Sequence, residues 1–181
     1  MQLDSQIQNN IEEHMHSSDF FQFLDQELRI YAEECVLSSI EAMKNKALEL
    51  NKNKVNKLKK SQLHSIPAVV QAGGMEKLQE LAKNQADKQS RPENSAFWGW
   101  FKGIIAVSGD IQEGSLPAHT SNHLKKAGII LPDPDSLPDK KSAKAQRKAN
   151  AEYIKPVLER VLPVFCEHFI CHYNYQVQEE K

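Results

Sequence analysis

The stretch that decides the fold is residues 18–47, SDFFQFLDQELRIYAEECVLSSIEAMKNKA. Its apolar residues recur every three or four positions: Phe20, Phe23, Leu24, Leu28, Tyr31, Cys35, Leu37 (or Val36) and Ile40. This spacing places them on one face of an α-helix and leaves charged residues on the opposite face. Ser18 or Asp19 could cap the helix, since a short oxygen-bearing side chain accepts hydrogen bonds from the first N–H groups. The stretch therefore predicts one long amphipathic helix.

The rest of the chain also has helical periodicity. Further helices are expected over residues 55–73, 75–82, 90–105, 121–127 and 140–169. Pro67 is expected to kink the first of these or break it just before, because proline removes a backbone hydrogen bond. Pro156 and Pro163 are expected to bend or split the last helix for the same reason. No β-hairpin signal occurs, so the sequence predicts an all-α fold.

The predicted architecture is a single compact bundle of about five or six helices over residues 18–175. Residues 108–139 hold four prolines and are interpreted as a long loop, containing one short helix, before the last helix. Residues 1–17 are polar and are expected to be a disordered N-terminal segment, and residues 176–181 a C-terminal tail. The chain of 181 residues is long enough for one domain with a real core.

Composition favours a cytoplasmic protein. The longest apolar run, residues 103–107, is far shorter than the roughly 20 residues of a membrane-spanning helix. The first residues lack the basic start and apolar stretch of a signal peptide. The three cysteines, Cys35, Cys166 and Cys171, are therefore predicted to be free thiols.

A net charge of −1 conceals a strong segregation of charge along the chain. Residues 1–43 hold nine acidic residues and one arginine, whereas residues 44–60 hold seven lysines and one glutamate. Lysine clusters bind phosphates and release counterions without reading base sequence. The candidate RNA-binding residues are Lys52, Lys54, Lys57, Lys59 and Lys60 in the first basic segment (residues 52–60), and Lys140, Lys141, Lys144, Arg147 and Lys148 in the second basic segment (residues 140–148).

The sequence contains none of the common catalytic or nucleotide-binding motifs GxGxxG, GxxxxGK[ST], GxSxG and HExxH. A C-terminal cluster, Cys166, His168, Cys171 and His172, has residue types that bind metals. Zinc sites usually draw their ligands from two separated pairs, and these four residues also suit a half-buried helix. His119 and His123 are four apart but lie in the proline-rich region, where packing is the simpler interpretation. No metal or cofactor is predicted.

Two other groups have a functional and a structural interpretation. Trp98, Trp100 and Phe101 could stack on bases, although Trp98 and Phe101 are more simply core residues. Arg160 and His168 are similar to the Arg…His pair of HEPN ribonucleases, which cleave RNA on a helical bundle. Seven residues separate them here, more than the four to six typical of that family, and Val161 replaces the polar residue expected after the arginine.

Three stretches, about a third of the chain, resemble the small subunit of the type III-B CRISPR effector, the Cmr complex. LDQELRIYAEECV (residues 24–36) is similar to an opening helix with a glutamine and an arginine followed by alanine and valine. LHSIPAVVQAGGM (residues 63–75) is similar to a segment with Leu-Pro, apolar residues and Gly-Leu. Residues 153–169 resemble its closing helix, with a tyrosine, an acid and aromatic residues. The chain departs from the family at Ile66, at Cys166 and in its long 108–139 region.

The resemblance implies a non-catalytic helical subunit that stacks in copies along the complex and lines the groove for guide and target RNA. RNA cleavage would belong to another subunit of the complex, and the lysines become RNA-backbone contacts by position and charge. Two alternatives stay open. A helical adaptor that binds only proteins would have the same bundle, with its lysines as solvated surface. A HEPN-like ribonuclease would require Arg160 and His168 to meet in a cleft.

Overall fold

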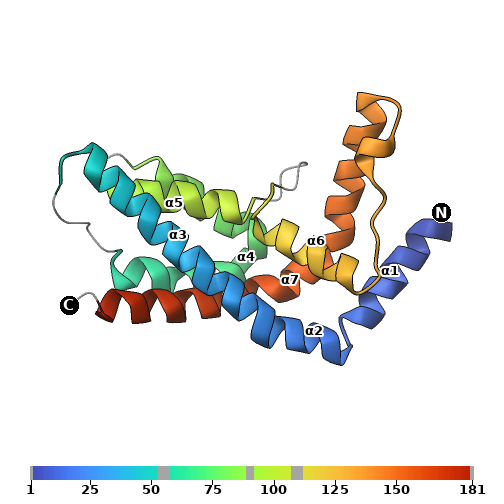
Figure 1. Ribbon diagram of the computed structural model, residues 1–181, viewed down its shortest axis with the longest axis horizontal. Coiled ribbons are helices and arrows are strands. Elements are labelled where there is room, and N and C mark those ends of the chain that lie inside the picture. Colours follow the sequence, from blue (N-terminus) through green and yellow to red (C-terminus); the bar gives the residue numbers. More distant parts are fainter. Residues whose placement is uncertain (1, 53–57, 89–91, 107–111, 180–181) are drawn as a thin grey trace.

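The computed structural model describes residues 2–52, 58–88, 92–106 and 112–179, and in these ranges the chain forms helices and turns but no β-strand. The elements in chain order are α1 (Gln2–His14), α2 (Ser18–Gln22), the π-helix η1 (Phe23–Glu27), α3 (Leu28–Glu49), α4 (Lys60–Ala86), α5 (Pro92–Ile104), α6 (Leu116–Lys126), the 3-10 helix η2 (Pro134–Ser136) and α7 (Lys140–Glu179). Figure 1 shows their arrangement. The predicted all-α class is confirmed. No helix of the described ranges is long and apolar enough to cross a membrane.

The predicted helix over residues 18–47 is present as α2, η1 and α3, which continue one another to Glu49. Its cap is Ser17 and not Ser18 or Asp19, because the Ser17 Oγ accepts the hydrogen bond from the Phe20 N–H at 3.2 Å. The π-helix inserts an extra residue into the helical repeat. Phe23 and Leu28, five apart, are therefore both buried on the inner face. The apolar spacing left either Val36 or Leu37 for the inner face of α3. Val36 is buried, and Leu37 is 51% exposed.

α4 continues through Pro67, and the expected break before this proline is not observed. The interruption lies instead at Gly73 and Gly74, where the backbone leaves helical geometry. Gly74 has φ 57° and ψ −142°, a conformation open essentially only to glycine. The two glycines therefore break α4 without ending it, and the chain resumes as a helix from Met75.

Replacing Gly74 with alanine is expected to lower the free energy of unfolding by about 1–3 kcal/mol, the usual cost of forcing a side chain into this backbone region. A Cβ at this position would meet nothing within 4 Å, so the loss would come from the backbone alone. Gly99→Ala is the matched control, because Gly99 is an exposed helical residue whose added Cβ also meets nothing within 4 Å. It is expected to stabilise the fold by about 0.5–1 kcal/mol. Equal effects of the two substitutions in urea unfolding would contradict this explanation.

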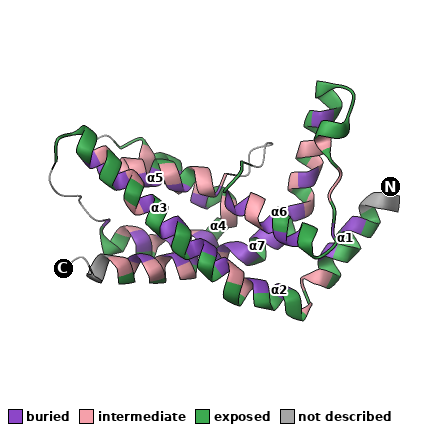
Figure 2. Ribbon diagram, in the orientation of Figure 1, coloured by how far each residue is buried: buried purple, intermediate pink, exposed green. Residues whose placement is uncertain are grey.

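The core lies where α3, α4, α5 and α7 pack together. It is rich in aromatic rings from two helices: Phe97, Trp98 and Phe101 of α5, and Phe165, Phe169 and Tyr173 of α7. Figure 2 shows the buried positions lining the inner sides of these helices. Trp98 and Phe101 belong to this core, as their spacing predicts, and are 1% and 0% exposed.

The region 108–139, interpreted as a long loop with one short helix, is described from residue 112 on, and there its helix is longer than expected. α6 begins at Leu116 after Ser115, whose Oγ accepts a hydrogen bond from the Ala118 N–H at 3.3 Å. Leu116 and Leu124 anchor α6 in the core. The predicted helix over residues 121–127 is therefore present, but it begins five residues earlier and ends at Lys126.

The predictions for the two ends of the chain are wrong. α1 is a helix over residues expected to be disordered, since Ile7 and Ile11, four apart, are buried against the body. At the other end α7 runs to Glu179, beyond the expected start of a tail at residue 176.

α7 is a single assigned helix of 40 residues, with Pro156 and Pro163 inside it. Figure 1 shows that it bends: its first part projects from the body and its second part runs along the base. Each proline removes one backbone hydrogen bond, which explains a bend without a break. The projecting part of the molecule, residues 129–150, is called the arm below.

Candidate nucleic-acid interface

The second basic segment forms the first turns of α7 in the arm. Asp139 caps this helix, since its Oδ1 accepts hydrogen bonds from the N–H groups of Lys141 and Ser142, each at 2.9 Å. The Ser142 hydroxyl donates to Asp139 Oδ2 at 2.6 Å. These hydrogen bonds lower the pKa of Asp139, the one from the Ser142 side chain most. A fixed carboxylate at the helix start therefore holds the lysine-bearing turns in a defined conformation.

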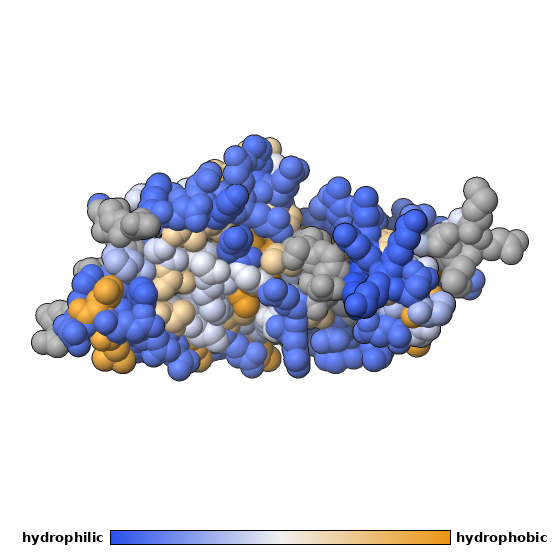
Figure 3. Space-filling view, turned by 90° about the horizontal axis from the view of Figure 1, so that it is seen from above, coloured by the Kyte–Doolittle hydropathy of each residue, from blue (hydrophilic) through white to orange (hydrophobic). Residues whose placement is uncertain are grey.

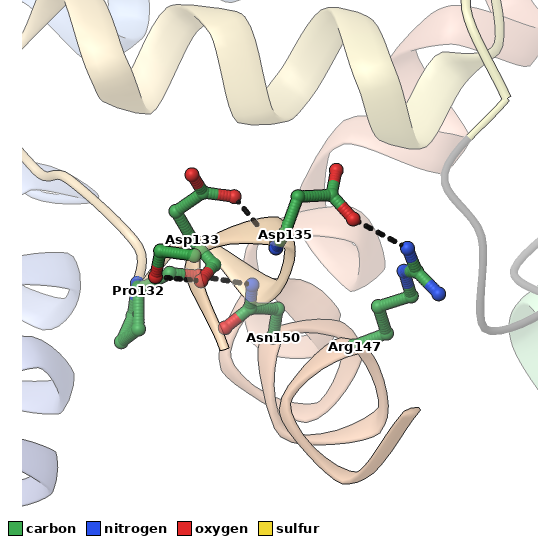
Figure 4. A network of polar contacts seen from close by, with 6 residues as sticks. Pro132, Asp133, Asp135, Arg147 and Asn150 are labelled. Carbon is green, nitrogen blue, oxygen red and sulfur yellow. Dashed lines mark hydrogen bonds and ion pairs between the residues drawn. The ribbon is translucent and has the colours of Figure 1, made fainter. Parts of the chain in front are cut away.

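The arm is braced by polar contacts between α7 and the segment before it (Figure 4). Arg147 Nη2 lies 2.6 Å from Asp135 Oδ1, and Asn150 Nδ2 donates to the Pro132 carbonyl at 2.9 Å. Asp133 Oδ1 accepts from the Asp135 N–H at 2.9 Å, which closes the turn at η2. Arg147 thus takes part in the internal structure of the arm, through an exposed ion pair that leaves its predicted role on RNA open.

Four lysines of the second basic segment are exposed on the arm: Lys140, Lys141, Lys144 and Lys148. Three of them are four residues apart, so they lie along one side of the helix, in a row about 12 Å long at 1.5 Å per residue. Figure 3, seen from above, shows hydrophilic side chains gathered over the end of the arm. The row is a surface that phosphates can reach.

The first basic segment is only partly placed by the structure, and Lys54 and Lys57 lie outside the described residues. Lys59 and Lys60 are exposed at the start of α4. Lys52 has a different environment: its Nζ lies 2.7 Å from Glu93 Oε1, and the Glu93 side chain is only 1% exposed. Lys52 therefore neutralises a buried carboxylate of α5, which its sequence position did not reveal.

The two basic segments lie at opposite ends of the molecule. In Figure 1 the start of α4 is at the left and the arm at the upper right. The structure does not bring the eight described candidate residues into one patch. A ligand that contacts both segments must extend along the molecule or be shared between neighbouring copies.

A groove near the arm adds one basic residue that the sequence did not single out. It has a volume of about 710 Å³ and lies between the glycine break of α4 and the middle of α7. Lys148 and Lys155 line it, together with apolar residues that include Leu158 and Leu162. Lys155 is seven residues after Lys148, so the two share a helix face. This spacing is the feature of the sequence that could have identified Lys155. Glu152 and Glu159 also line the groove, so its charge is mixed.

The acidic N-terminal part of the chain forms a separate surface on α3. Its exposed side includes Glu33, Glu34 and Glu41. Three large apolar residues of α3 are exposed as well: Ile30 at 55%, Leu37 at 51% and Leu48 at 70%. Their spacing of seven and eleven residues places them along one line of the helix. This acidic face carries the mixture of apolar and charged groups typical of a protein contact.

The residues of the alternative interpretations have structural contacts. Arg160 Nη1 donates to the Met15 carbonyl at 2.9 Å, and His168 Nε2 lies 3.2 Å from the Leu24 carbonyl oxygen. Eight positions on one helix separate the two by about 12 Å along its axis. The chain therefore does not bring this pair together as a HEPN-like site requires. Trp100, the better candidate for stacking on bases, is half-buried against Phe169, with ring centroids 6.2 Å apart.

The C-terminal cysteine and histidine residues do not converge. Burial raises the pKa of the Cys166 thiol to about 12, so this residue remains protonated at neutral pH. Cys171 is exposed, and all three cysteines are free thiols. Over the ranges that the structure describes, no group of three or more His, Cys, Asp and Glu side chains is placed to hold a metal ion.

Comparison with known proteins gives no match to any family model, curated protein or solved structure.

Proposed function

We propose that this chain is a non-catalytic helical subunit of a type III-B CRISPR effector complex that contacts the backbone of guide and target RNA through lysines. The observation that carries the proposal is the braced, projecting arm with Lys140, Lys141, Lys144 and Lys148 exposed on it. The assignment to a type III-B effector complex comes from the resemblance to the Cmr small subunit, which covers residues 24–36, 63–75 and 153–169.

The arm suits a phosphate backbone for electrostatic reasons. Residues 133–148 hold five basic and three acidic residues, a net charge of +2. Asp135 is paired with Arg147, and Asp139 caps the helix. The remaining lysines share one short stretch of helix, and such clusters bind phosphates without reading base sequence.

The structure also narrows the set of proposed contacts. Lys52 is paired with the buried Glu93 carboxylate, so the proposal rests mainly on Lys59 and Lys60 at one end of the molecule and on the four exposed arm lysines at the other. Arg147, whose ion pair is exposed, remains a candidate beside the arm lysines. Lys54 and Lys57 remain candidates by sequence alone.

The acidic face of α3 supports a second part of the proposal, contact with sister subunits. Exposed Ile30 and Leu37 lie among acidic residues of α3, and Leu48 extends the apolar line toward the lysine-bearing end of the helix. A protein surface could cover this line. The same observation favours the alternative of an adaptor that binds proteins and no RNA. Binding of RNA by the isolated chain distinguishes the two.

The test is binding of single-stranded RNA by the full chain and by a variant with Lys140, Lys141, Lys144 and Lys148 all changed to glutamine. The wild type is expected to bind in the micromolar range, indifferent to base sequence. The variant is expected to lose about tenfold or more in affinity at low salt. The slope of log K against log salt should fall by about 2–3, since each phosphate contact on a single strand contributes about 0.7.

A matched control changes four exposed lysines elsewhere, Lys83, Lys88, Lys102 and Lys125, to glutamine, which gives the same net charge. It should retain most of the affinity. Equal losses in the two variants would mean that net charge and not the arm governs binding, and no binding by the wild type would favour the adaptor. The RNA should also stay intact, whereas cleavage abolished by His168→Ala would restore the ribonuclease interpretation.

A further inference from the structure

Two histidines meet at the junction of α1 and α6. His14, the last residue of α1, places its Nε2 atom 2.9 Å from Nε2 of His123 in α6. The two residues are 109 positions apart in the chain, so only the fold brings them together. The ring centroids are 5.0 Å apart.

Packing fixes both rings. His123 stacks on Phe23 with ring centroids 3.9 Å apart and an interplanar angle of 16°. His14 contacts Phe20 edge-on at 5.7 Å, and its Nδ1 lies 3.3 Å from Ser17 Oγ. Held in this way, the two Nε2 atoms face each other at hydrogen-bond distance, and which of them donates depends on the tautomer. The other nitrogen of His123, Nδ1, is buried and has no hydrogen-bond partner among the described residues.

Burial favours the neutral form of both imidazoles, which is the form that binds metals. Burial lowers the pKa of His14, opposed by Asp19, and lowers the pKa of His123 to about 4. Glu27 and Lys126, which are paired with each other at 3.0 Å, act on the His123 pKa in opposite directions.

Solvent reaches His14 from one side, whereas His123 is buried. An open cavity of about 330 Å³ is lined by His14 and Ser17 and by residues of the turn after α6, including Gly128 and Ile129. Glu13 also lines it. Water can therefore reach an ion held by the two histidines only from the side of His14.

We propose that His14 and His123 bind a divalent transition-metal ion through their Nε2 atoms, with Zn²⁺ as the representative ion. Two nitrogens at the usual Zn–N distance of about 2.0–2.1 Å in a tetrahedral site lie about 3.3 Å apart. The present separation of 2.9 Å therefore needs to open by only a few tenths of an ångström. The bound ion would fasten α1 to α6, an effect independent of RNA binding.

The test is calorimetric titration of the metal-free full chain with Zn²⁺ in a non-chelating buffer. One ion per chain is expected, and His14→Gln and His123→Ala should each weaken binding about tenfold or more. His16→Ala changes an exposed histidine two positions from His14 and should bind as the wild type does. His168→Ala combined with His172→Ala removes the other histidine pair and should also leave binding unchanged.

Hydrogen exchange supplies a second readout. Zn²⁺ is expected to slow exchange of the amides of α1 in the wild type and not in His14→Gln, because the ion stabilises the docked state of this helix. His14 lies at the end of α1, so His14→Gln is expected to fold, and its Zn²⁺ binding can be measured even if His123→Ala is unstable. The proposal fails if the wild type binds no Zn²⁺, or if the ion binds but His14→Gln binds it as tightly.

Discussion

Replacing Phe169 with alanine is expected to lower the free energy of unfolding by about 4 kcal/mol, near the middle of the range for buried phenylalanines. Phe169 is 0% exposed. Its ring lies 5.5–6.4 Å, between centroids, from five other aromatic rings: Phe97, Trp100, Phe101, Phe165 and Tyr173. Alanine would leave a cavity lined by rings from two helices, which cannot all move inward.

Chemical denaturation monitored by circular dichroism measures this effect. Phe21→Ala is the matched control, because Phe21 is 56% exposed and its loss should change the free energy of unfolding by less than about 0.5 kcal/mol. A similar, small effect of both substitutions would show that the rings at the α5–α7 contact are not the centre of the core.

Replacing Lys52 with methionine is expected to lower the free energy of unfolding by about 1–3 kcal/mol, because a buried charged acceptor would lose its partner. The Glu93 carboxylate is 1% exposed, and Lys52 Nζ lies 2.7 Å from it. The comparison is Lys46→Met, which breaks the equally short Lys46–Glu49 pair, whose side chains are 40% and 63% exposed. An exposed pair of this kind contributes about 0–1 kcal/mol.

The same pair predicts a dependence on pH. The hydrogen bond from Lys52 lowers the pKa of Glu93 from its usual value of 4.5. The stabilisation from the ionised carboxylate is therefore fully present above pH 4.5 and is lost as the pH falls through the folded-state pKa. The difference between wild type and Lys52→Met should shrink in that acidic range. A constant difference would assign the effect of Lys52 to packing.

Lys52 also illustrates which parts of the site the sequence could predict. Runs of lysine indicate exposed surfaces, and Lys59, Lys60 and the arm lysines are exposed as this pattern predicts. The pairing of Lys52 with Glu93 joins residues 41 positions apart, and no local pattern encodes it. Whether the exposed lysines bind RNA stays a prediction.

The fold was predictable where periodicity was regular. The helix over residues 18–47 followed from its apolar spacing. Its π-helix did not, because one inserted residue changes the spacing of the apolar residues by a single position, and the pattern already allowed such a choice between Val36 and Leu37. α1 was missed because it buries only two isoleucines, Ile7 and Ile11, in an otherwise polar stretch. In such helices tertiary packing, and not local composition, decides whether the helix forms.

The metal-binding proposal depends even more on tertiary structure. His119 and His123 form the pair that the sequence suggests, yet the close nitrogen–nitrogen contact joins His123 to His14. The two histidines are 109 residues apart, and no pattern in a single sequence predicts a contact over that distance.

The continuity of α7 has a thermodynamic consequence for any ligand of the arm. The helix that bears the arm lysines also contributes Phe165 and Phe169 to the core, so the lysines stand on a scaffold that is already ordered. A flexible basic tail must give up conformational freedom when it binds, and that loss subtracts from its affinity. In this molecule folding has ordered the backbone beforehand, and the free energy of charge neutralisation is available for binding.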